Sequence, residues 1–148
     1  MPRLDLEAIP VRDGSDYPPP HDRPVADRAV RLLSGAAGLE DFVVAHAVIP
    51  PGGWSSQRHW HEGEDEFVTV LSGEGVLVDD LGRTPVRAGD CLAFPKGEAN
   101  GHHIVNEGEV PLVLVAVSVP ERSACHYPDI GLSWAPEEGY RGEEGTAR

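Results

Sequence analysis

Two histidines two positions apart, followed by a glutamate, are the residues best suited to chemistry in this sequence. His59 and His61 lie in segment 54–61, which has the composition of a β-strand, and Glu66 opens the next such segment after a short turn. Side chains two positions apart in a strand point to the same side, with Cα atoms roughly 7 Å apart. Across a hairpin, Glu66 faces the two imidazoles. The three side chains can therefore converge on one metal ion.

A fourth donor is available on a distant strand segment, where His102 is the candidate. Three imidazoles and one carboxylate suit a borderline divalent ion such as iron, manganese, nickel, cobalt, copper or zinc. Around an octahedral ion, four protein donors leave two positions open, and an open position distinguishes a catalytic site from a structural one. The alternative is that the histidines are incidental residues of a structural barrel.

Strand alternation assigns further side chains to the same interior. Val68 and Val70 share the face of the carboxylate donor and Ile104 that of the fourth donor, so a pocket with apolar walls is expected. Gln57 shares the face of the first two histidines, and it either reaches the pocket or forms a hydrogen bond within the wall. Asn106 either contacts a ligand or holds a turn.

The spacing of these residues resembles the first motif of the cupin superfamily, in the form Gly53-x5-His59-x-His61-x4-Glu66-x6-Gly73. All five motif positions are present at the expected separations. The match supports the assignment of the two histidines and the glutamate to one site.

A second stretch resembles the second cupin motif, in the form Gly89-x5-Pro95-x-Gly97 followed by His102-x3-Asn106. The two motifs also occur in the expected order. The tail sequence HYPDIGL, at 126–132, is similar to that of small bacterial single-domain cupins.

The resemblance implies that one divalent metal ion is bound by His59, His61, Glu66 and His102. His103 competes with His102, and the spacing to the motif asparagine fits His102 only. The resemblance covers about 41–119 and implies an all-β fold, a double-stranded β-helix or jelly-roll barrel, with the ion inside.

The pattern of the chain is typical of such a barrel. Within 41–119, no segment has the length and period of an amphipathic helix. Residues 1–40 are predicted to form an N-terminal arm with a short strand at 29–33, and residues 120–148 a C-terminal strap over the barrel, all within one domain. Short strands separated by turns are expected at 41–49, 54–61, 66–73, 75–80, 83–87, 90–94, 102–106 and 112–119.

Composition excludes several functions for these 148 residues. A net charge of −13, from 25 acidic and 12 basic residues, disfavours binding to nucleic acid or to anionic membranes. The sequence has no apolar run of 18 residues for a membrane span and no secretory signal. Its two cysteines are expected to be free thiols in the cytoplasm.

The function expected from these residues is that of a metal-dependent enzyme acting on a small molecule. Dioxygenase chemistry with iron comes first. Isomerase, decarboxylase or lyase chemistry with manganese, nickel or zinc is the alternative, as is a cupin that binds a small ligand without turnover. None of the barrel cations, Arg58, Arg83, Arg87 and Lys96, is placed inward. This favours a neutral substrate, or an acid held by the metal alone.

A homodimer is expected from two aromatic residues. By strand alternation, Trp60 and Phe67 point outward on strands expected to be adjacent. An exposed aromatic patch needs a cover, and a two-fold pair of barrels would bury it on both subunits.

Overall fold

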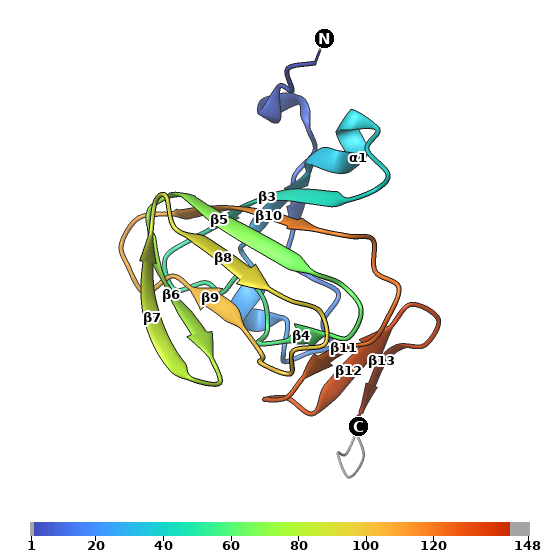
Figure 1. Cartoon of the computed structure of the whole chain (residues 1–148). Coiled ribbons are helices and arrows are strands. Elements are labelled where there is room, and N and C mark those ends of the chain that lie inside the picture. The colour runs from blue at the N-terminus through green and yellow to red at the C-terminus, as the bar shows by residue number, and fades with distance from the viewer. Residues whose placement is uncertain (1, 143–148) are drawn as a thin grey trace.

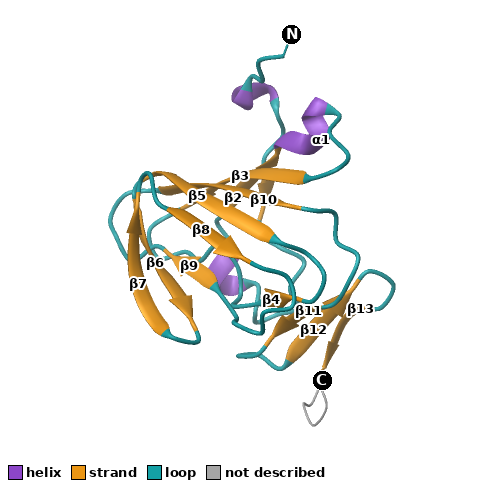
Figure 2. Cartoon of the chain, in the orientation of Figure 1, coloured by secondary structure: helices purple, strands orange, loops and turns teal. Residues whose placement is uncertain are grey.

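Short antiparallel strands dominate the computed structural model, which describes residues 2–142 (Figures 1 and 2). The largest sheet has six strands in the order β1-β2-β3-β10-β5-β8. These strands are Arg12–Asp13 (β1), Ala29–Leu32 (β2), Val43–Ile49 (β3), Leu112–Ser118 (β10), Glu66–Ser72 (β5) and Cys91–Phe94 (β8).

Two smaller sheets complete the barrel, and the all-β prediction is confirmed. One has the order β7-β6-β9 and the other the order β13-β12-β11-β4. The first consists of Gly82–Arg87 (β7), Glu74–Asp79 (β6) and His103–Val105 (β9). The second consists of Gly139–Gly142 (β13), Leu132–Ala135 (β12), Cys125–Tyr127 (β11) and Trp60–His61 (β4).

Within residues 2–142, helical structure is confined to the arm. The predicted strand at 29–33 ends at Leu32, because a short helix, α1 (Leu33–Ala37), follows directly and ends at Gly38 with a left-handed φ of 70°. Two single-turn 3₁₀ helices, Leu6–Ala8 and Arg23–Val25, precede it. Among the described residues, 41–119 contains no helix, as predicted.

The barrel core lies between the six-stranded and three-stranded sheets. Its members come from β3, β5, β7, β9 and β10, and burying each such aliphatic side chain contributes about 1.5–3 kcal/mol. This core closes one end of the barrel. The buried residues are Ile49, Val68, Val70, Val86, Ile104, Leu112 and Leu114.

A second core joins the arm to the strap. Tyr17 and Val25 of the arm pack against Cys125, Tyr127 and Leu132 of the strap. Strand β11 pairs with β4, so the strap continues the sheet that carries the histidines (Figure 1). The final part of the predicted strap, 143–148, lies outside the described residues.

The predicted strand at 54–61 is wrong over most of its length. Only Trp60–His61 forms a strand, while Trp54 and His59 make isolated bridges. The backbone between them bonds to both β9 and the arm, and the N–H of Ser55 donates to the Ile104 carbonyl at 2.8 Å. The N–H of Gln57 donates to the Tyr17 hydroxyl at 3.2 Å, and the Arg28 guanidinium donates to the carbonyl of residue 55.

Candidate metal centre

Four predicted donors are brought together by β4, β5 and the segment before β9. His59 and His102 face each other in an isolated antiparallel bridge, with reciprocal backbone hydrogen bonds of 3.1 and 2.9 Å. His61 lies in β4, and Glu66 is the first residue of β5. Residues 43 positions apart in the sequence thus become direct neighbours.

One donor cluster consists of His59, Glu66 and His102. Their ligand atoms all lie within 4.8 Å of one another. The Nε2 of His102 is hydrogen-bonded to a Glu66 carboxylate oxygen at 2.7 Å, and the rings of His59 and His102 are 4.7 Å apart. The carboxylate and two of the three imidazoles are therefore close enough together to bind one ion.

His61 belongs to an overlapping cluster with His59, and their rings are 4.9 Å apart. Its Nδ1 is buried and has no hydrogen-bond partner among the described residues, although a Glu64 carboxylate oxygen lies 3.9 Å away. An unsatisfied buried polar atom costs about 1–3 kcal/mol. A metal ion would satisfy this nitrogen, so the donor set fits such an ion.

The ring orientation of His59 also suits coordination. Its Nδ1 lies 2.8 Å from the carbonyl oxygen of Gln57, which directs the Nδ1 hydrogen to that acceptor. The lone pair of Nε2 is then free for an ion, the arrangement in which histidine ligands are usually held. His103 makes the same kind of bond, from its Nδ1 to the Ser56 carbonyl at 2.8 Å, and it differs because it is in neither donor cluster.

Electrostatics favour the protonation states that bind cations. Burial lowers the pKa of His59 to about 3, so its imidazole is neutral at physiological pH. Burial by itself would raise the pKa of Glu66, but the hydrogen bond from His102 and the nearby histidines bring it down to about 2. A neutral imidazole beside a carboxylate is the form that metal ions require.

A cavity of about 510 Å³ opens beside these donors. Val68 and Ile104 contribute apolar wall, as predicted from alternation. Val70 does not line it, contrary to the prediction. Gln57 and Asn106 do not line it either, which favours the second of the two alternatives given for each. Val70 is 1% exposed within the barrel core, the Gln57 amide donates to a carbonyl of the arm at 2.7 Å, and the Asn106 amide donates to two backbone carbonyls at 2.9 Å and holds a turn.

The cavity also contains groups that were not identified from the sequence. Arg28 enters from the arm. The barrel cations Arg58, Arg83, Arg87 and Lys96 do not line the cavity, in agreement with the expectation for them. Tyr127 enters from the strap, with its ring 5.8 Å from that of His59 and its pKa raised by burial. Cys125 does not line the cavity but lies beside the histidines, and burial raises the pKa of its thiol to about 12. Strand alternation at 125–127 could have indicated that Cys125 and Tyr127 share one face. It does not predict that β11 pairs with β4.

The fold is an antiparallel jelly-roll barrel, and imidazole and carboxylate donors lie beside its internal cavity. These features define a class of small β-barrel proteins with an interior ion site. The chain belongs to the cupin superfamily, since residues 45–118 match the cupin domain family. The predicted double-stranded β-helix fold is thereby confirmed.

Similar proteins include one of nearly the same length. A crystal structure of a sugar phosphate isomerase of the cupin superfamily from Silicibacter pomeroyi is 36% identical, covers 99% of this chain and 96% of that one, and has a TM-score of 0.92. A Thermotoga maritima protein predicted to be an oxalate decarboxylase is 28% identical, over 79% of this chain and 97% of its own, with a TM-score of 0.64.

A curated relative matches a shorter stretch. The oxalate-binding protein of Thermotoga maritima is 40% identical over 75 residues, which are 51% of this chain and 60% of that protein. The match thus spans less than two thirds of the relative. Among the described residues, no helix is both long and apolar enough to cross a membrane.

Proposed function

We propose that this protein is a metal-dependent enzyme that acts on a small anionic molecule held in the barrel cavity. The observation that carries the proposal is that one cavity contains both the donor cluster and the side chain of Arg28. A metal ion and a guanidinium lining the same space provide two positive groups for one ligand.

The surroundings of Arg28 support an anionic ligand. Its Nε donates to the Gly14 carbonyl at 3.0 Å, and its Nη1 donates to the Ser55 carbonyl. Among the described residues, no carboxylate forms an ion pair with it. Burial lowers the pKa of Arg28, but an arginine stays charged at neutral pH. A partly buried guanidinium held by carbonyls alone is suited to a carboxylate or phosphate group.

The chain's own groups have separable roles in this proposal. An ion held by the three histidines and Glu66 would supply Lewis-acid polarisation of a substrate oxygen. Arg28 orients the anionic end of the substrate, while Val68 and Ile104 exclude water from one wall. The hydroxyl of Tyr127, which burial keeps protonated, holds a proton beside the site.

These groups favour acid–base chemistry, namely isomerisation, decarboxylation or lyase cleavage. Two similar proteins have names that refer to anionic ligands, a sugar phosphate isomerase and an oxalate-binding protein. A dioxygenase is the second candidate, supported by a donor set of three histidines and one carboxylate that suits iron as well as manganese, nickel or zinc. A cupin that binds a ligand without turnover is the third. The predicted cytoplasmic location stays a prediction.

Arg28→Met tests the substrate class. We expect wild-type protein loaded with each metal to convert a member of a panel of sugar phosphates and small dicarboxylates, followed by NMR, without oxygen consumption. In the variant, KM should rise about 10–100-fold, because a hydrogen bond to a charged group contributes about 1.5–3 kcal/mol. Arg31→Met is the matched control, since Arg31 also donates to a backbone carbonyl of the arm but does not line the cavity.

Other outcomes would replace this proposal. Oxygen uptake in proportion to substrate, measured with an electrode, would establish the dioxygenase instead. Saturable binding of a panel compound without conversion would support the binding module. An unchanged KM in Arg28→Met would show that Arg28 does not bind the substrate, and would refute the proposal that the substrate is anionic.

We also propose that the protein is a homodimer, but through a different surface from the one expected. Trp60 stacks on the ring of His126 at 4.5 Å, and β4 does not neighbour β5, so Trp60 and Phe67 form no common patch. Phe67 instead lies near Phe42, and the two are 41% and 42% exposed beside Val117. This apolar face is the candidate interface.

Phe67→Glu tests the dimer by light scattering. The wild type is expected at twice the chain mass, and the variant at the chain mass, because a charge cannot be buried unpaired in an interface. Leu81→Glu is the control, since Leu81 is 93% exposed at the β6–β7 turn. A monomeric wild type at tens of micromolar would refute the dimer.

A further inference from the structure

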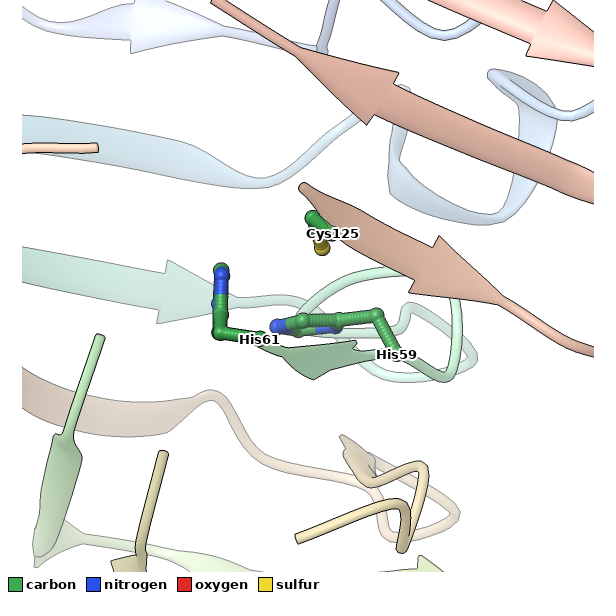
Figure 3. Close-up of side chains that lie close together, drawn as sticks. All are labelled: His59, His61 and Cys125. Carbon is green, nitrogen blue, oxygen red and sulfur yellow. The ribbon is translucent and has the colours of Figure 1, made fainter. Parts of the chain in front are cut away.

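A thiol lies next to His61 of β4 and His59, which precedes that strand. The ligand atoms of His59, His61 and Cys125 all lie within 4.8 Å of one another, and Figure 3 shows the sulfur directed toward the two imidazoles. The strand register explains this placement, because Cys125 of β11 is paired directly with His61 of β4. Cys125 is 2% exposed, so the sulfur faces the interior.

We propose that Cys125 is a ligand of the bound ion, in addition to the histidines and the carboxylate. The inference rests on the metal binding of the proposed function and extends it to the identity of the ion. Coordination by the thiol forms a metal–sulfur bond and releases the thiol proton to solvent.

The separations are compatible with one shared ion. Donor atoms lie about 2.0–2.1 Å from zinc for nitrogen and about 2.3 Å for sulfur, so two donors of one ion are at most about 4.4 Å apart. The observed limit of 4.8 Å exceeds this by only a few tenths of an ångström. Side-chain rotations of that size bring the thiol and both imidazoles into one coordination sphere.

His59 connects this cluster to the one with the carboxylate. It is the member common to both groups, the other being His59, Glu66 and His102. An ion bound to His59 would therefore have donor atoms of both clusters within reach. His61 supports the same placement, because its buried Nδ1 has no hydrogen-bond partner among residues 2–142.

A sulfur ligand would decide which metal the site prefers. Three imidazoles and a carboxylate accept iron, manganese, nickel, cobalt or zinc, whereas thiolate is a soft ligand and manganese prefers oxygen. With Cys125 in the coordination sphere, the site should select zinc, cobalt or iron over manganese.

Cobalt(II) tests the ligand directly by spectroscopy. Metal-free protein is titrated with cobalt(II), and the bound cobalt is counted by elemental analysis. We expect an intense near-ultraviolet thiolate-to-cobalt charge-transfer band that grows in proportion to bound cobalt, together with the weaker visible bands of the ion. Cys125→Ser should lose the near-ultraviolet band and keep the visible ones. Cys91→Ser, which removes the other cysteine of the chain, should keep both.

Metal competition provides a second readout. The preference for zinc over manganese should fall by about tenfold or more in Cys125→Ser, since even groups outside the coordination shell contribute about 10–100-fold to metal affinity. If Cys125→Ser does not fold, Cys91→Ser carries the test, because Cys125 is then the only thiol present.

Three results would overturn the inference. Bound cobalt without the near-ultraviolet band would exclude the thiol as a ligand and leave the proposed metal site intact. A band that survives Cys125→Ser would assign the sulfur elsewhere. Failure of wild-type protein to bind cobalt, zinc or iron would refute this inference and the proposed metal site together.

Discussion

His59→Ala is expected to lower metal affinity about 100-fold or more. His59 is the donor common to both clusters, so its loss removes a ligand whichever neighbours the ion uses. Groups that merely orient a ligand contribute about 10–100-fold, and loss of the ligand itself should cost at least the upper part of that range. Elemental analysis after dialysis, with isothermal titration for affinity, measures the effect.

His103→Ala is the matched control for this variant. His103 is also buried, at 6% exposure, and its Nδ1 also bonds to a backbone carbonyl, but it is in neither donor cluster. The His103→Ala variant should bind metal with the affinity of the wild type. Full occupancy in His59→Ala, or loss of metal only in His103→Ala, would refute the assignment of ligands. Circular dichroism separates loss of metal from loss of fold.

Gly73→Ala is expected to destabilise the fold by about 3 kcal/mol or more. Gly73 has a φ of +82°, which costs a residue with a side chain about 1–2 kcal/mol. A Cβ there would also lie 3.1 Å from the Cα of Leu112 and closer still to the Pro111 carbonyl oxygen. Both contacts are backbone at the start of β10 and cannot rotate away. Thermal unfolding should show a midpoint lower by about 6 °C or more.

Gly52→Ala separates backbone strain from the steric clash. Gly52 has nearly the same φ, +83°, and a Cβ there would meet nothing within 4 Å. This variant should be destabilised only by the conformational cost of a positive φ, about 1–2 kcal/mol. Equal destabilisation of the two variants would mean that β10 shifts to accommodate the extra carbon, and that the close approach is not rigid.

The donor set could be predicted from sequence because its determinants are local. Alternation along a strand places His59 and His61 on one side, and a short turn returns the chain at Glu66, so three donors follow from a dozen residues. His102 required the second motif, since nothing local relates it to His59. The structure pairs the two in a bridge.

Alternation failed where the strand itself was not formed. A pocket position for Gln57 depended on a continuous strand from 54 to 61, but its backbone N–H and its side-chain amide both bond to the arm. Val70 does alternate with Val68 on one face, yet it lies deeper in that face, beyond the end of the cavity. The face to which a side chain points is set within one strand, whereas its depth inside the barrel depends on how the sheets pack together.

The sequence by itself determined the fold class, the strands of the barrel other than the one at 54–61, and the residues that can hold an ion, because periodicity and motif spacing are properties of short segments. Only the tertiary structure decided what else shares the site. Arg28 precedes His59 by 31 positions and Cys125 follows it by 66, and they reach the site through the contacts of the arm with 54–57 and the register of β11 on β4. Such pairings are selected by the packing of the whole barrel, since no local pattern specifies which distant segment supplies the cover.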